Sequence, residues 1–299
     1  MSEGAGTGHP PRVMGLMDVA LFYIVTGVSL RWIATAAAAG PGSLLVWLGA
    51  FLFFYIPLAM AVLELSSRQP EEGGLYAWAR HSFGNLAGFL AGWCYWTSNL
   101  PYFPAVFYFA ASNAIYIGGD DWLWLNDHPS YFVIFAIASL VLIAWLNIAG
   151  LKHARWLHNI GAIGMWLPVA VIALLGVISW FRFGSASEFS AATMTPRFEL
   201  KEMLFWASLT FAFSGSETAS FMSEEIKDPR RTIPRALIIS GAVIALCYIL
   251  GTIAVLVILP PDQVNSMSGL LQAASTAAAK LGWLWLVPVM AFLIAVGNL

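Results

Sequence analysis

Long stretches of this chain carry no charged side chain, and this feature limits the possible folds more than any other. Leu44 to Leu63 gives twenty consecutive residues without an Asp, Glu, Lys or Arg. A helix needs about 20 largely apolar residues to cross a membrane, because each residue rises about 1.5 Å. Such runs are too long and too uniformly apolar for barrel strands, so the sequence predicts an all-α polytopic membrane protein. The eight segments that we predict to span are 13–38, 44–63, 86–117, 131–149, 156–180, 203–222, 236–259 and 281–299.

The composition agrees with a membrane protein and excludes several other classes. Charged residues make up 10% of the 299 residues and apolar residues 60%, whereas an average soluble protein carries roughly 25% charged residues. The net charge of −2 lacks the basic excess of a nucleic-acid-binding protein, and the apolar content excludes disorder. The two cysteines, Cys94 and Cys247, both lie in apolar segments, so a disulfide scaffold is excluded as well.

Motifs for catalysis, metals and cofactors do not occur in the sequence. There is no His-Glu-x-x-His, Cys-x-x-Cys, phosphate-loop or Gly-x-Ser-x-Gly motif. His153 and His158 are five residues apart and stand beside Lys152 and Arg155, which favours a cluster facing anionic lipid over a metal site. We therefore expect no enzyme activity, no metal and no cofactor.

Basic residues in the loops predict the orientation, because cytoplasmic loops carry the excess of Lys and Arg. With a cytoplasmic N-terminus, nine basic residues face inward: Arg12, Arg68, Arg80, Lys152, Arg155, Lys227, Arg230, Arg231 and Arg235. Four face outward: Arg182, Arg197, Lys201 and Lys280. The remaining basic residue of the fourteen, Arg31, lies inside the first segment. This distribution predicts a multi-pass protein of the cell (inner) membrane, with residues 1–12 as a cytoplasmic tail.

Two ionisable side chains interrupt predicted spans, at a cost of about 2.5–3.5 kcal/mol each on insertion scales. Arg31 lies in the first span and Glu217 in the sixth, each beside a cluster of Gly, Ser and Thr, at 26–29 and 214–216. Glycine weakens a helix and hydroxyl side chains can satisfy freed backbone groups. We therefore expect both spans to be broken within the membrane, which is the pattern of a secondary transporter built from inverted repeats.

Each of these features also has a simpler interpretation. Small residues within a span commonly serve as packing contacts between helices, and Arg31 in the outer half of its span has the length to reach the surface. Asn99 in the third span either bonds a neighbouring helix or contacts a ligand, while Pro101 and Pro104 favour a kink. It is the joint occurrence of both clusters, each near a charge, that favours a binding site.

Three of the connecting segments have features of their own. Residues 64–85 are expected to form an amphipathic helix lying flat at the interface on Tyr76, Trp78 and Phe83. Residues 224–235 are rich in charge and interrupted by Pro229 and Pro234, and residues 260–280 form a polar outer loop with weak helical character.

Two long motifs of this sequence resemble those of a known family. Glu64 to Trp93 (ELSSRQPEEGGLYAWARHSFGNLAGFLAGW) resembles the signature between the second and third spans of amino acid–polyamine–organocation permeases. Phe211 to Ala236 (FAFSGSETASFMSEEIKDPRRTIPRA) resembles their sixth span and following loop. The layout is closest to bacterial amino acid permeases and glutamate/GABA antiporters. The resemblance implies the leucine-transporter fold, which has two inverted repeats of five spans each.

The resemblance also implies roles for individual residues. Backbone N–H groups of the unwound first span would bind the substrate carboxylate, and carbonyls of the unwound sixth span its amino group. An aromatic residue would cover the substrate, and an acidic residue would serve as an inner gate and proton sensor. The matching positions are Thr26, Gly27, Val28 and Ser29 for the carboxylate, Phe213, Ser214 and Gly215 for the amino group, Phe211 for the cover and Glu217 for the gate.

The sequence departs from the family pattern in three ways. Arg31 is unexpected in the first span. Together with Asn99 it is a candidate charge partner of the substrate. Met165 stands where some proton-coupled members carry a lysine. Family members also have about twelve spans, so we expect residues 13–180 to form a complete first repeat, 181–202 an outer loop and 203–299 a partial second repeat of a longer protein.

The sequence thus predicts a secondary transporter of amino acids or related amines that works by alternating access. The expected partners are the substrate, the lipid bilayer, and protons or a counter-substrate, with no nucleic acid. Two alternatives are a membrane sensor that binds an amino acid without transporting it and an inactive permease fragment.

Overall fold

The computed structural model describes residues 14–69, 73–149, 151–196 and 199–298. The described chain is helical and contains no strand, apart from a single bridge that pairs Met14 with Ile226. The prediction of an all-α protein is confirmed. The chain divides into two compact units, and each is described by itself. Unit 1 comprises Met1–Gly27, Ala50–Thr97 and Phe213–Ile244, and unit 2 comprises Val28–Gly49, Ser98–Ala212 and Ala245–Leu299.

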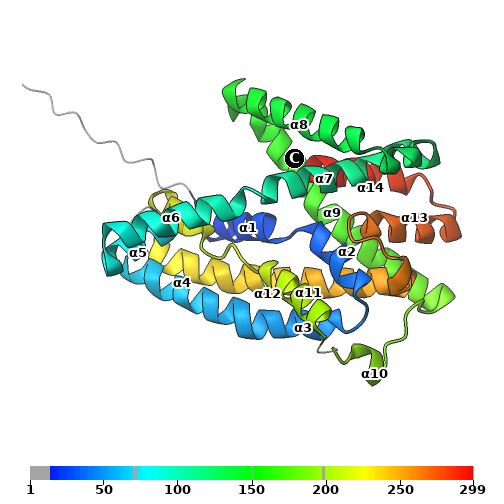
Figure 1. The fold of residues 1–299 in the computed structure, drawn as a ribbon, viewed down its shortest axis with the longest axis horizontal. Coiled ribbons are helices and arrows are strands. Elements are labelled where there is room, and N and C mark those ends of the chain that lie inside the picture. The colour runs from blue at the N-terminus through cyan, green and yellow to red at the C-terminus, as the bar shows by residue number, and fades with distance from the viewer. Residues whose placement is uncertain (1–13, 70–72, 150, 197–198, 299) are drawn as a thin grey trace, which may run out of the picture. The chain divides into compact units, whose positions relative to one another are not determined.

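Unit 1 is built around a core of apolar side chains from helices far apart in the sequence. Its elements are α1 (Leu16–Gly27), η1 (Phe51–Tyr55), α4 (Ile56–Arg68), α5 (Gly74–Phe83), α6 (Asn85–Asn99) up to Thr97, η3 (Thr218–Glu225) and the first half of α12 (Pro229–Ile258) (Figure 1). The core consists of Val19, Ala20, Tyr23, Val62, Trp78, Ile226, Ile233, Ala236 and Leu237. Burial of such side chains stabilises the fold by about 1.5–3 kcal/mol each.

The burial of one residue of α5 differs from that expected of an amphipathic helix at residues 64–85. Trp78 is only 4% exposed and belongs to the core of unit 1, and its Nε1 donates to the carbonyl of Gln69 at 3.2 Å. Tyr76 and Phe83, by contrast, remain exposed. The expectation is therefore wrong for Trp78, because its ring packs with the core side chains of unit 1 instead of lying on an exposed apolar face.

Unit 2 contains the remaining elements. They are α2 (Leu30–Ala38), α3 (Ser43–Ala50) up to Gly49, α7 (Tyr102–Ala114), η2 (Ile115–Asp127), α8 (Pro129–Ala149), α9 (Leu151–Phe183), α10 (Ala191–Met194), α11 (Leu200–Phe211), the second half of α12, η4 (Pro261–Gln263), α13 (Gly269–Leu281) and α14 (Leu286–Gly297). In Figure 1, α14 lies beside α7 and α9, and it packs against both. The side chains of His153 and His158 lie outside the described residues.

The helix α13 contains the stretch for which weak helical character was expected within residues 260–280. It packs against α2 and α9, and one face of the helix is buried. Most residues of that face are small and apolar, which permits the close approach of neighbouring helices. They include Ala273, Ala274, Ala277 and Ala278. Composition indicated the helix but not its burial, because the burial of an alanine-rich face depends on the helices that cover it.

The span predictions can be compared with the helices. Four helices of the described chain are long and apolar enough to cross a membrane: Ser43–Arg68, Pro129–Leu146, Ile163–Phe183 and Pro229–Ile258. The bent pair Leu16–Gly27 and Leu30–Ala38 makes a fifth if it is counted as one span. The predicted third and sixth spans are interrupted helices, and α14 covers part of the predicted eighth. The total of eight spans therefore stays a prediction.

The start of α12 corrects the expectation for residues 224–235. Pro229 and Pro234 do not interrupt a loop but lie at the first residue and within the early turns of α12. A proline is tolerated at the first position because the N–H that it lacks has no partner within the helix.

Candidate functional site

The first helix break lies between α1 and α2. The chain leaves the helix at Val28 and Ser29, and Ser29 is the extended N-cap of α2, with φ −118° and ψ 119°. Thr26 and Gly27, by contrast, stay in the last turn of α1, where the Thr26 hydroxyl donates to the carbonyl of Phe22 at 2.8 Å. The predicted break is present but shorter than the four residues expected. The first N–H groups of α2 have no intrahelical partner, and the N–H of its N-cap, Ser29, donates to the hydroxyl of Tyr248 at 3.2 Å.

The second helix break follows α11, which ends at Phe211. The chain is non-helical from Ala212 to Glu217, and η3 then begins at Thr218. Gly215 has a φ of +104°, a conformation that residues with a side chain rarely adopt. The serines and the glycine at 214–216 thus break the helix where the sequence predicted.

The carbonyl of Gly215 is already used within the break. It accepts hydrogen bonds from the N–H of Thr218 at 3.1 Å and from the Thr218 hydroxyl at 2.7 Å. A carbonyl oxygen has two lone pairs, so these two bonds fill its capacity. In this conformation the carbonyl of Gly215 therefore has no capacity left for an amino group.

Glu217 is a buried carboxylate with a specific partner. Its side chain lies in unit 1 and is 8% exposed, and its Oε1 accepts a hydrogen bond from the hydroxyl of Tyr95 at 3.1 Å. The ring of Tyr95 in turn lies against Phe221, with centroids 5.4 Å apart. A buried carboxylate requires such a donor, because an unpaired buried charge is costly. Tyr95 was missed by the sequence analysis, because a tyrosine within a span is common and lacks the cost that makes a buried charge informative.

Two aromatic residues near the second break have different surroundings. Phe213 is 2% exposed and packs in unit 1 against the rings of Phe51 and Tyr55, with centroids 5.9 and 5.8 Å apart. Phe211, the expected cover of the substrate, belongs to unit 2 and is 56% exposed. Ser216 also lies in the second break, and its buried hydroxyl has no hydrogen-bond partner among the described atoms. A hydroxyl of this kind is available to a ligand.

Arg31 and Asn99 both lie in unit 2. The guanidinium of Arg31 stands 4.6 Å from the ring centroid of Trp32, a cation–π contact. No described carboxylate is within ion-pair distance of it. Asn99 is the last residue of α6, directly before the interruption that the sequence predicted as a kink at Pro101.

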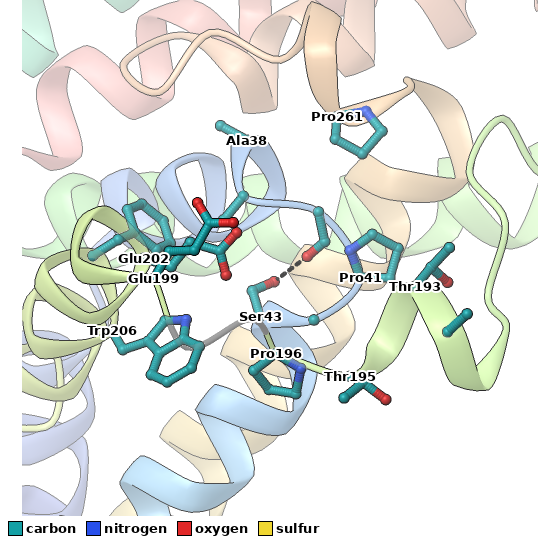
Figure 2. A pocket seen from close by; sticks show the side chains of 15 residues that line it. Ala38, Pro41, Ser43, Thr193, Thr195, Pro196, Glu199, Glu202, Trp206 and Pro261 are labelled. Carbon is teal, nitrogen blue, oxygen red and sulfur yellow. Dashed lines mark hydrogen bonds between the residues drawn. The ribbon is translucent and has the colours of Figure 1, made fainter.

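A cavity of about 670 Å³ in unit 2 lies apart from the predicted site residues, none of which lines it. Figure 2 shows the carboxylates of Glu199 and Glu202 at the cavity, with Thr193 and Pro261 on other sides. The hydroxyl of Ser43 donates to the carbonyl of Gly40 at 2.7 Å, which holds the loop before α3 along the cavity wall. The cavity therefore combines acidic, hydroxyl and aromatic side chains, the last including Trp206.

Comparison with known proteins gives a consistent result. Residues 13–299 match the family described as "Amino acid permease". An uncharacterized transporter of Legionella pneumophila is 29% identical over 293 residues, covering 97% of this chain and 62% of the relative. A probable agmatine/putrescine antiporter of Lactococcus lactis is 24% identical, with 89% and 56% covered. The Asc-type amino acid transporter 1 of Mus musculus is 27% identical, with 81% and 46% covered. The chain thus spans between 46% and 62% of the length of these relatives.

Proposed function

Because this chain belongs to the amino acid permease family, we propose that the whole protein carries an amino acid or a related amine across the membrane by alternating access. The observation that carries this proposal is the pair of helix breaks, one after Gly27 and one after Phe211. Continuous helices satisfy their own backbone groups, whereas a break within a span leaves N–H and C=O groups that can bind a polar ligand.

The breaks have the chemistry that an amino acid requires. The N–H groups of Val28 and Ser29, at the positive end of α2, would bind the carboxylate. The carbonyls that follow α11, at the negative end of that helix, would bind the ammonium group. The expected positions are Phe213, Ser214 and Gly215, and the carbonyl of Gly215 would have to give up its bonds to Thr218. Phe211 would cover the substrate.

Glu217 and Tyr95 would form a gate beside the second break. Their hydrogen bond of 3.1 Å connects α6, which carries Tyr95, to the segment directly before η3, which carries Glu217. Breaking this bond would release the segment from α6. A proton on Glu217 would change the bond, which couples the gate to pH. The relative that is named an antiporter supports exchange against a counter-substrate as the second means of coupling.

The preference of the site for a charged or neutral substrate would depend on Arg31. With no described carboxylate paired to it, its guanidinium is suited to an anionic substrate group, and Asn99 would add a neutral hydrogen bond. We place the protein in the inner membrane with a cytoplasmic N-terminus, as the loop charges favour.

Reconstitution of the full-length gene product in liposomes tests the function. Uptake of radiolabelled leucine, glutamate and putrescine would be measured into empty liposomes and into liposomes preloaded with unlabelled compound. We expect uptake of at least one probe above that of protein-free liposomes. Binding detected by thermal shift without any flux would instead establish a sensor, and the absence of both would overturn the proposal.

A matched pair of glycine variants links transport to the second break. Gly215→Ala forces a side chain into a φ of +104° within the break, whereas Gly282→Ala does so at the end of α13, with a φ of +74°. We expect Gly215→Ala to lower the initial uptake rate about tenfold or more and Gly282→Ala to retain it, since the strain of roughly 1–2 kcal/mol is common to both. Equal rates in the two variants would contradict a role for the break.

A further inference from the structure

Tyr248 forms hydrogen bonds with two helix ends of unit 2, the start of α2 and the end of α11. It lies on α12 and is completely buried. Its hydroxyl oxygen accepts a hydrogen bond from the N–H of Ser29, at 3.2 Å, and the hydroxyl donates to the carbonyl of Ala212, at 3.4 Å. Ser29 is the N-cap of α2 and Ala212 follows the last residue of α11. One side chain therefore contacts the N–H end of one break and the C=O end of the other.

The ring of Tyr248 is held in place by its neighbours. It stacks on the indole of Trp47, with centroids 4.5 Å apart and planes inclined by only 8°. The Nε1 of Trp47 donates to the hydroxyl of Thr252 at 3.1 Å, one turn further along α12, and both of these side chains are fully buried. The position of the phenol is thus determined by packing, independently of its own hydroxyl contacts.

The two groups that the hydroxyl satisfies are of the kind that an amino acid would satisfy. A phenol accepts and donates at the same oxygen, while an amino acid accepts through its carboxylate and donates through its ammonium. A buried N–H or C=O without a partner costs about 1–3 kcal/mol, so an empty binding site needs a substitute for its ligand. The O–H···O contact to Ala212, at 3.4 Å, is longer than the usual 2.5–3.0 Å, and the N–H···O contact from Ser29, at 3.2 Å, is at the upper limit of its range. The charged groups of an amino acid would form stronger bonds.

We propose that Tyr248 is a positioning residue whose hydroxyl substitutes for the substrate at both helix breaks when the carrier is empty. This inference rests on the proposed function, because it assigns Ser29 and Ala212 to the substrate site. The hydroxyl lowers the free energy of the empty site, so a substrate must replace it on binding. It also allows the empty carrier to return across the membrane, a step that net uptake requires and that exchange of one substrate for another avoids.

The variant Tyr248→Phe removes the hydroxyl and keeps the stacked ring. A matched control is Tyr131→Phe on α8, which loses a hydroxyl that donates to the carbonyl of Ala111 at 2.9 Å, elsewhere in unit 2. Both variants of the full-length gene product would be reconstituted in liposomes with radiolabelled leucine, glutamate and putrescine as probes. For Tyr248→Phe we expect KM to fall severalfold, and net uptake into empty liposomes to fall about tenfold more than exchange into preloaded ones.

A structural defect would give a different pattern of rates. It would lower net uptake and exchange together and would leave KM unchanged or raised, and this outcome would overturn the proposal. Tyr131→Phe should show neither the lower KM nor the changed ratio of net uptake to exchange. The same change in ratio in both variants would likewise count against a specific role of Tyr248.

Hydrogen–deuterium exchange separates this proposal from the proposed function. The peptide that contains Ser29 should exchange faster in Tyr248→Phe than in the wild type, with no substrate added, and should be unaffected in Tyr131→Phe. If the peptide exchanges faster but the protein neither transports nor binds any of the probes, the contact between Tyr248 and Ser29 is supported and the proposed transport function is overturned. Unchanged exchange at that peptide would overturn the substitution by Tyr248 even if transport is observed.

Discussion

Glu217 illustrates what a single buried side chain contributes at the second break. Its carboxylate is 8% exposed and accepts its hydrogen bond from Tyr95. Glu217→Gln keeps the size and an oxygen that can accept this bond, but removes the charge and the titration. We expect the maximal uptake rate to fall severalfold and its dependence on pH to flatten, because the side chain can no longer gain or lose a proton.

The measurement for Glu217→Gln is the initial rate of uptake in liposomes across a pH series. Glu199→Gln is the matched control, since Glu199 is an exposed carboxylate at the cavity of unit 2, away from the breaks. It should keep both the rate and the pH profile of the wild type. A Glu217→Gln profile that parallels that of the wild type would exclude this residue as a proton sensor.

The same residues indicate how far a sequence can identify a site. Glu217 and Arg31 were found because a charge within a predicted span is costly and therefore informative. Tyr95 and Tyr248 were missed, because a tyrosine within a span is not costly and gives no comparable signal. Tyr95 is 122 residues from its partner Glu217, and Tyr248 is 219 from Ser29. Such pairs are brought together only by folding.

At the scale of elements, local chemistry located the breaks but not the packed surfaces. The clusters at 26–29 and 214–216 predicted both breaks, because glycine and hydroxyl residues weaken a helix wherever they occur. The burial of Trp78 and of α13 was not predicted, because burial depends on neighbouring elements. The start of α5 shows the same dependence at one glycine.

Gly74 at the start of α5 combines two requirements for a missing side chain. It has a φ of +50°, and a Cβ at this position would lie 2.6 Å from the Ser220 hydroxyl and 2.8 Å from a ring carbon of Phe221, both in η3. Gly74→Ala should therefore destabilise unit 1 by about 1–2 kcal/mol of backbone strain and by about 1–3 kcal/mol of overpacking. The measurement is thermal unfolding in detergent.

The control for Gly74→Ala is Gly282→Ala, the left-handed C-cap of α13. Its φ is +74°, and nothing lies within 4 Å of the added Cβ, so only the backbone strain applies. We expect Gly74→Ala to have the lower Tm of the two. Equal values would show that η3 moves aside without cost.

At the scale of the whole molecule, the orientation in the membrane can be tested with two matched serines. Ser82 in α5 is predicted to face the cytoplasm and Ser130 in α8 the outside, and both are exposed. In a chain with Cys94 and Cys247 replaced by serine, Ser130→Cys should react with a membrane-impermeant maleimide added to whole cells. Ser82→Cys should react only after the membrane is permeabilised. The reverse result would invert the orientation derived from the loop charges.

The sequence by itself determined that this protein is an all-α membrane protein of the permease family and where two of its spans are interrupted. These properties follow from apolar runs, single charges and helix-breaking residues, whose effects are local and act before any tertiary contact forms. The tertiary structure alone decided which groups satisfy the interrupted helices. Tyr95 reaches Glu217 in unit 1, and Tyr248 reaches Ser29 and Ala212 in unit 2. A buried polar group needs a partner, but only the packing of distant helices selects which residue provides it.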